Sequence, residues 1–145
     1  GCENLWALRR TFSESLKATG LQKLNEDIAV PRGKLVELVR FGEELARDYS
    51  TPVACFGHAG DGNIHVNIMV ENPDLPATEA HMADALDALF QRVLGMGGAI
   101  TGEHGVGLAK KRWWPQAVDA GSHELHRRIK QALDPAGILN PGKFL

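Results

Sequence analysis

Cysteines and long apolar runs are both scarce in this sequence. The 145 residues include two cysteines, Cys2 and Cys55, which lie far apart and form no CxxC pair, so neither a disulfide framework nor a cysteine-based zinc knuckle is expected. No apolar run approaches the roughly 18 residues of a membrane span, and no basic segment leads into a short apolar stretch with a cleavage site, as in a signal peptide. These absences predict a domain without a membrane span in a reducing, cytoplasmic compartment.

A large excess of one charge sign is also missing. The chain has 16 basic and 18 acidic residues, a formal net charge of -2, and both signs are spread along it without a basic stripe. A nucleic-acid-binding surface needs clustered basic side chains that neutralise phosphates, so nucleic acid is not an expected partner. With 43% hydrophobic and 23% charged residues, the composition is that of a globular domain with a core.

Apolar spacing predicts helices that interleave with short strands. Leu5, Leu8 and Phe12 recur at helical spacing, and this pattern starts almost at once, without an initiator methionine, which suggests a segment of a longer chain. Helices are expected over residues 5–16, 35–46, 82–94 and 122–133, and strands over 23–30, 52–56, 64–70 and 99–101. Strict alternation of strand and helix is missing, so the predicted fold class is α+β: a largely antiparallel sheet with helices packed on one face.

The segment GHAGDGNIHVN, residues 57–67, gathers polar side chains directly after an apolar strand. If residues 61–62 form a two-residue turn, His58 lies opposite His65, and directly opposed residues have Cβ atoms about 4.5 to 5.5 Å apart on one face. Two imidazoles in this arrangement can share a metal ion. Strand alternation places Asn67 on the same face, where it could contact whatever the metal binds.

A second glycine-flanked segment, GEHG at residues 102–105, adds a carboxylate and a third histidine. His58, His65 and Glu103 form the ligand set of an open, catalytic zinc-type site, in which the fourth position is left to water or substrate. Adjacent residues on a turn point differently, so Glu103 is expected to bind the metal while His104 moves protons. Two histidines seven residues apart are, on their own, more often hydrogen-bonded surface groups; the added Glu and His favour the metal site.

Other polar and aromatic residues have simpler interpretations. Three further histidines are expected to be solvated on helix surfaces: His81, His123 and His126. The pair Trp113-Trp114 is expected to serve packing or an interdomain contact.

Five motifs in order resemble one known family. LWALRR, NEDIAVP, GHAGDGNIHVN, GGAITGEHGVGLAKKR and DPAGILNPGK closely resemble the C-terminal domain of FAD-linked oxidases of the vanillyl-alcohol oxidase type, in the branch with glycolate oxidase, D-lactate dehydrogenase and D-2-hydroxyglutarate dehydrogenase. The match spans nearly the whole chain. The resemblance implies that residues 1–145 form a single C-terminal substrate or cap domain, and that FAD is bound mainly by an N-terminal domain absent from this sequence.

The resemblance also implies roles for individual residues. Residues matching His58, His65 and Glu103 hold a divalent cation, usually zinc, and the residue matching His104 is the general base. Arg9 matches an arginine that pairs with the substrate carboxylate, and Asn67 matches a substrate-contacting asparagine. The tail containing Asn140 matches a segment near the flavin, so Asn140 is the cofactor-binding candidate.

Two positions depart from some relatives of this family. Those relatives carry a lysine at the position of Asn25 and a threonine at the position of Ser13. A site for a second substrate carboxylate is therefore not implied by the resemblance.

The predicted function is oxidation of a D-2-hydroxy acid to a 2-oxo acid by hydride transfer to flavin, with an unknown electron acceptor. This chain alone is expected to be inactive, because nothing in it resembles a domain that binds the FAD pyrophosphate. Two alternatives remain: a self-contained hydrolase in which His58, His65 and Glu103 hold a metal-bound water, and a non-catalytic binding module of the same fold. Metal analysis and the neighbouring N-terminal sequence would distinguish them.

Overall fold

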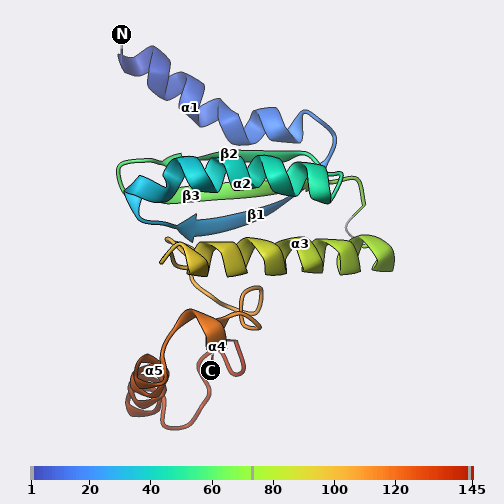
Figure 1. Ribbon diagram of the computed structural model, residues 1–145. Helices are drawn as coiled ribbons and strands as arrows, with labels where there is room; N and C mark the ends of the chain where they lie inside the picture. The colour runs from blue at the N-terminus through green and yellow to red at the C-terminus, as the bar shows by residue number, and fades with distance from the viewer. Residues whose placement is uncertain (1, 73, 144) are drawn as a thin grey trace.

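The computed structural model describes residues 2–72, 74–143 and 145. Helices and strands follow one another largely as the apolar spacing predicts, with three α-helices, one short 3-10 helix and a three-stranded sheet in the first two thirds of the chain (Figure 1). The elements are α1 (Cys2–Lys17), β1 (Gln22–Ala29), the 3-10 helix η1 (Arg32–Lys34), α2 (Leu35–Asp48), β2 (Val53–His58), β3 (Asn63–Val70), α3 (Pro76–Gly95), α4 (Trp114–Ala117) and α5 (Ala120–Leu133).

The sheet has the strand order β1-β3-β2, and both pairings are antiparallel, which confirms the α+β fold class. The strand expected over residues 99–101 is wrong, because only Ala99 pairs, through an isolated bridge to Ala29. Its neighbour Gly98 lies so close to β1 that an added Cβ would be 2.5 Å from the Ala29 carbonyl oxygen. The chain therefore touches the sheet edge at one point and turns away.

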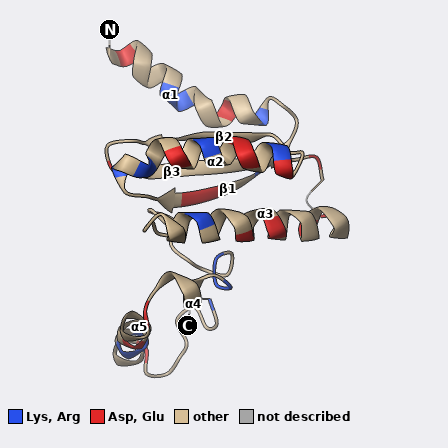
Figure 2. Ribbon diagram, in the orientation of Figure 1, with Lys and Arg blue, Asp and Glu red and all other residues tan. Residues whose placement is uncertain are grey.

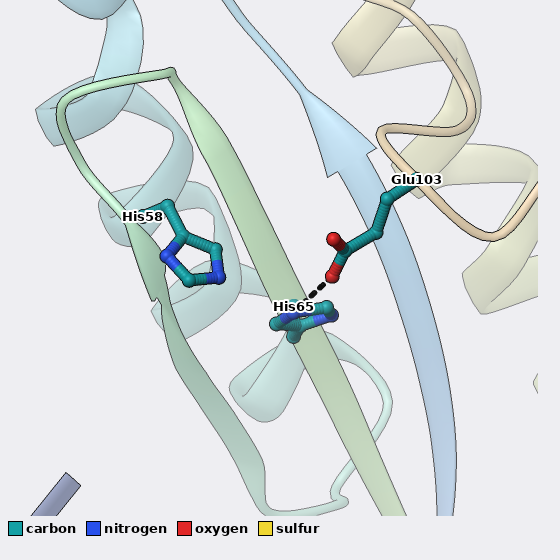
Figure 3. Close-up of side chains that lie close together, drawn as sticks. All are labelled: His58, His65 and Glu103. Atoms are coloured by element: carbon teal, nitrogen blue, oxygen red, sulfur yellow. Dashed lines mark ion pairs between the residues drawn. The ribbon is translucent and has the colours of Figure 1, made fainter.

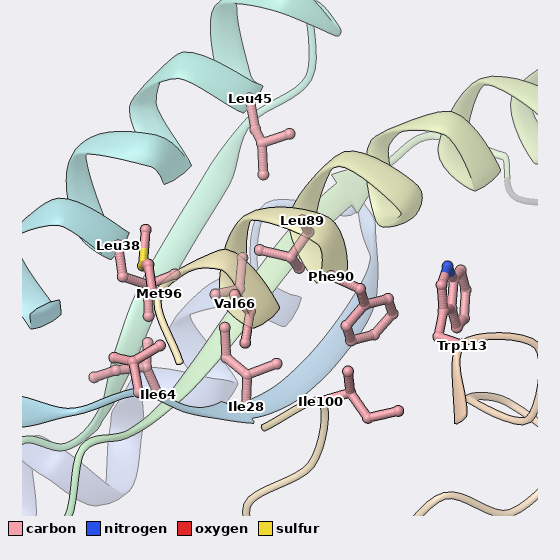
Figure 4. Close-up of a cluster of buried hydrophobic side chains, with 12 residues drawn as sticks. Ile28, Leu38, Leu45, Ile64, Val66, Leu89, Phe90, Met96, Ile100 and Trp113 are labelled. Atoms are coloured by element: carbon pink, nitrogen blue, oxygen red, sulfur yellow. The ribbon is translucent and has the colours of Figure 1, made fainter. Parts of the chain in front are cut away.

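One face of the sheet is apolar and carries the core. Side chains alternate along each strand, so Ile28 of β1 and Ile64 and Val66 of β3 point to the same side. The helices α2 and α3 cover this face and contribute Leu38 and Leu89 (Figure 4). Burial of this apolar surface fixes which face of each strand points inward, and so leaves the polar side chains on the other face.

The opposite face of the sheet is polar. It carries Asp27 from β1 together with Asn63, His65 and Asn67 from β3, all reached by the same alternation. The first helix lies on this side, next to β2, where the rings of Phe12 and Phe56 are 5.9 Å apart (Figure 1). The space between α1 and the polar face is where the candidate site forms.

The hairpin between β2 and β3 has a longer loop than the sequence predicts. His58 pairs with Asn63, and His65 pairs with Phe56, so the expected opposition of His58 and His65 is wrong. The loop spans residues 59–62, and Gly62 adopts a left-handed φ of 75° in it. The register differs by two residues, and because strands have a period of two, both histidines still point to the same face.

The helices α4 and α5 lie away from the sheet (Figure 1). Trp113 packs into the core with its ring centroid 4.4 Å from that of Phe90, which confirms the expected packing role. His123 and His126 are half-buried edge-on against Trp114, so the expectation of solvated side chains is wrong for both. The residue pattern of α5 does not indicate that these two histidines pack against a tryptophan outside the helix.

Charged side chains of both signs are interspersed on the helices, as Figure 2 shows along α2 and α3. Within the described part of the chain, no helix is both long and apolar enough to cross a membrane.

Candidate metal and substrate site

The polar face of the sheet brings three predicted ligands together. His58 comes from the end of β2, His65 from β3, and Glu103 from the turn that follows the Ala99 bridge (Figure 3). One potential ligand atom from each of the three residues lies within 4.8 Å of the other two. The carboxylate oxygen of Glu103 is 3.6 Å from Nε2 of His65.

These separations fit one shared cation. In a tetrahedral site with bonds of about 2.0 to 2.1 Å, two ligand atoms are roughly 3.4 Å apart. The His65–Glu103 distance of 3.6 Å is close to that value, and one ligand atom of His58 lies within 4.8 Å of both. Two imidazoles and one carboxylate are a donor set suited to zinc and similar divalent ions.

The surroundings of His65 favour its neutral form. Its side chain is 12% exposed, and burial, the largest effect, lowers the pKa of this imidazole below its usual value. A neutral imidazole keeps the lone pair that a metal ligand needs. Its Nδ1 is buried without a hydrogen-bond partner among the described residues.

His104 lies beside the three candidate ligands and is not part of their group. Its ring centroid is 5.4 Å from that of His65, and the two planes are inclined by 31°. The residue is exposed, so its ring can meet a substrate from the open side. Of these two adjacent turn residues, Glu103 belongs to the group with His58 and His65, and the roles of ligand and base stay predictions.

Arg9 reaches the same site from α1. Its Nη2 lies 3.0 Å from Nε2 of His58, so the guanidinium donates to the imidazole. Arg9 also lines a cavity of about 440 Å³ between α1 and the sheet, which we call the Arg9 cavity. Its wall consists of Arg9, Arg10, Phe12, Ser13, Lys23, Asn25, Phe56, Gly57 and His65.

The two remaining predicted site residues lie elsewhere. Asn67 is fully buried on β3, and its amide donates to the carbonyl oxygens of Ala54 and His65, so it lies behind the cavity wall. Asn140 is exposed in the C-terminal tail, with a left-handed φ of 47°, and lines a separate cavity of about 210 Å³. The structure does not bring Asn140 to the metal ligands.

Sequence reasoning missed a buried carboxylate beneath the site. Asp27 is fully buried, and its Oδ2 accepts hydrogen bonds from the backbone N–H groups of residues 102, 103 and 104 at 2.8, 2.7 and 2.8 Å. Burial alone would raise the pKa of Asp27, but these hydrogen bonds and one from Asn63 outweigh it and hold the pKa well below its usual range. The sequence feature that could have indicated this residue is an acidic side chain directly before Ile28 within a predicted strand.

Residues 1–144 match the family described as FAD linked oxidases, C-terminal domain. The chain therefore belongs to that family.

Particular relatives show the range of the family. The glycolate oxidase subunit GlcD of Bacillus subtilis (strain 168) is 33% identical over 145 residues, which cover 98% of this chain and 31% of the relative. A D-lactate dehydrogenase of Archaeoglobus fulgidus is 34% identical, covering 99% of this chain and 31% of that protein. The mitochondrial D-2-hydroxyglutarate dehydrogenase of Bos taurus is 35% identical, covering 97% and 25%. The chain therefore spans less than a third of the length of these relatives.

Proposed function

We propose that the chain is the substrate- and metal-binding cap domain of an FAD-dependent dehydrogenase that oxidises a D-2-hydroxy acid to a 2-oxo acid. The observation that carries this proposal is the grouping of His58, His65 and Glu103 within 4.8 Å, with His104 beside them. Relatives named for glycolate, D-lactate and D-2-hydroxyglutarate support the substrate class.

His58, His65 and Glu103 would hold a divalent ion, zinc in our proposal. Such an ion supplies a Lewis acid for the hydroxyl and carboxylate oxygens of a 2-hydroxy acid. Oxidation removes a proton from the hydroxyl group and a hydride from C2, and His104 would accept that proton. The hydride chemistry belongs to the flavin, while this domain orients the substrate.

Arg9 would fix the substrate carboxylate. A lone pair on Nε2 of His58 cannot serve both the guanidinium and a cation, so binding of a cation through that atom would release Arg9. The freed guanidinium presents donors in a planar fork that matches a carboxylate. Arg9 lines the cavity next to His65, where that carboxylate would lie.

The exposed apolar residues on α1 and α5 support a further domain in the longer protein. Neither helix has a buried residue within its described length. Leu5 and Leu8 on α1 and Leu125 and Leu133 on α5 are 70%, 58%, 57% and 77% exposed. The FAD-binding domain of the same polypeptide would cover such surfaces.

The function is tested on the full-length protein that contains this chain. We expect bound FAD, a stoichiometric divalent metal, and dye reduction with D-2-hydroxy acids that stops after treatment with a chelator and returns with zinc. A protein that is fully active without metal would contradict the proposal, and so would metal-dependent ester or amide hydrolysis without flavin reduction.

Replacing Arg9 by lysine in the full-length protein should lower kcat/KM roughly 10- to 100-fold. Lysine keeps the charge but loses the bidentate fork, and one charge-assisted hydrogen bond is worth about 1.5 to 3 kcal/mol. Steady-state kinetics with the best substrate gives the measurement, and metal content should not change. The matched control is Arg128→Lys on α5, where the arginine pairs with Glu124. An unchanged kcat/KM for Arg9→Lys would return Arg9 to a surface role.

Lys23 gives the cavity a second anchor for an anionic substrate. It lies on β1 two residues before Asn25, so it points to the same face, and its Nζ donates to Oγ of Ser13 at 2.7 Å. An ammonium group has three donors, so two remain for a ligand. Lys23 would thus take the place of the lysine that some relatives carry at Asn25, and a dicarboxylic 2-hydroxy acid would fit.

The Lys23→Met substitution should therefore discriminate between substrates. We expect KM for D-2-hydroxyglutarate to rise about tenfold or more, as for a lost charge-assisted hydrogen bond, while KM for D-lactate stays nearly unchanged. Lys17→Met, at the exposed end of α1, is the matched control. Equal changes in KM for both substrates would show that Lys23 does not determine substrate specificity.

A further inference from the structure

The turn that carries Glu103 and His104 is held in place by one side chain. The backbone N–H groups of residues 102–104 converge on Oδ2 of Asp27, and the next N–H, of Gly105, donates to Oγ1 of Thr101 at 2.8 Å. The Thr101 hydroxyl donates in turn to the same Asp27 oxygen, at 3.2 Å. Four successive amides therefore end, directly or through one hydroxyl, on Asp27.

The position of Asp27 itself is fixed from three sides. Its backbone pairs with that of His65 on β3, so the side chain that holds the turn projects from a position beside a candidate ligand. Its Oδ1 accepts from the amide of Asn63 at 2.6 Å, while the buried ammonium of Lys110 donates to the backbone oxygens of Asp27 and Ile100 at 2.7 and 2.8 Å. The turn and β1 are thereby tied together on both sides of the carboxylate.

The turn lies directly against this carboxylate. A Cβ added to Gly102 would be 2.0 Å from Nδ2 of Asn63 and 2.7 Å from Oδ1 of Asp27, so only glycine permits this approach. The Glu103 side chain is 58% exposed, and its distance of 3.6 Å from His65 depends on where its backbone is held.

We propose that Asp27 is a positioning residue of the metal site, because it fixes the backbone from which Glu103 meets His65 and His104 lies beside them. This inference rests on the proposed function. Groups that orient metal ligands typically change metal affinity or activity 10- to 100-fold when they are replaced.

The test uses the full-length protein with Asp27→Asn. The substitution keeps the shape of the side chain, but its new NH₂ group must face either the amide of Asn63 or the backbone N–H groups of the turn. We expect zinc affinity, measured by competition with a chromophoric chelator, to fall about 10- to 100-fold, with the circular dichroism spectrum and FAD content retained. The visible spectrum of the cobalt-substituted protein should also change, which loss of stability alone would not cause.

The matched control is Asp119→Asn. Asp119 also accepts a backbone N–H, from Ser122, but it does so at the start of α5. This variant should keep the zinc affinity and the cobalt spectrum of the wild type.

A milder variant decides the matter if Asp27→Asn fails to fold. Thr101→Val removes the hydroxyl that accepts from Gly105 and donates to Asp27, and zinc affinity should fall about two- to tenfold, because the three direct amide bonds to Asp27 remain. A folded Asp27→Asn protein with wild-type zinc affinity and cobalt spectrum, or in its place an unaffected Thr101→Val, would overturn the inference.

A His58→Ala variant separates this inference from the proposed function. If the wild type binds zinc and His58→Ala does not, while the Asp27 variant matches the wild type, only the inference fails. If the wild type and His58→Ala are alike in binding no zinc, the metal site itself is wrong, and both fail.

Discussion

Replacement of His104 by alanine in the full-length protein is expected to lower kcat about 10²- to 10⁴-fold, the usual contribution of a general base, which is the role proposed for His104. Metal and FAD should remain bound, because the proposed ligands are His58, His65 and Glu103, and the His104 ring lies beside them at 5.4 Å from His65. The measurement is steady-state kcat together with elemental analysis of the purified protein.

Alanine at His58, His65 or Glu103 should instead lose the metal, since each change removes one of three ligands. His81→Ala is the matched control, because His81 lies on α3 and its Nε2 donates to the Tyr49 carbonyl oxygen at 2.8 Å. Loss of metal in His104→Ala with retention in Glu103→Ala would reverse the assignment of ligand and base. Unchanged metal content in all four site variants would refute the metal site.

The Gly62→Ala substitution is expected to cost about 2 to 4 kcal/mol in the free energy of unfolding of this domain. Gly62 has a φ of +75°, and its added Cβ would be 2.1 Å from the carbonyl oxygen of Val30. The backbone cannot yield easily, because the Val30 N–H donates to the Gly62 carbonyl at 2.9 Å. Scanning calorimetry of the full-length protein should show the transition of this domain at a lower temperature.

Gly60 provides a control within the same loop. A Cβ there meets nothing within 4 Å, and its φ lies outside the left-handed region, so Gly60→Ala should change stability by about 0.5 kcal/mol or less. Equal stability of the two alanine variants would show that the loop does not have the conformation described. The loop joins His58 to Asn63, so metal content should also fall in Gly62→Ala but not in Gly60→Ala.

Most elements of this fold follow from local sequence, although the strand expected over residues 99–101 does not form. Leu5, Leu8 and Phe12 mark α1 by their spacing, and the strand patterns around Ile28 and Ile64 mark the sheet, because side-chain period decides which face a residue occupies. The chemistry of the candidate site could also be predicted. Histidines and a glutamate between glycines suggest a metal-binding donor set before any distance is known, and metal binding itself stays a prediction.

Local patterns could not predict the contacts between residues that are far apart in the sequence. The hairpin register depends on a four-residue loop whose Gly62 packs against Val30, a contact across 32 positions that no turn rule contains. Arg9 reaches His58 because α1 lies on the polar face of the sheet.

By itself, the sequence determined most of the elements, the family and the choice of candidate ligands, since these depend on periodicity and on residue chemistry. The tertiary structure alone decided the register of the hairpin, the Arg9 cavity and the role proposed for Asp27. The carboxylate of Asp27 accepts hydrogen bonds from the backbone N–H groups of residues 75 to 77 positions away. Such long-range hydrogen bonds form only when burial of the core fixes β1 against the rest of the chain, so no local pattern reports them.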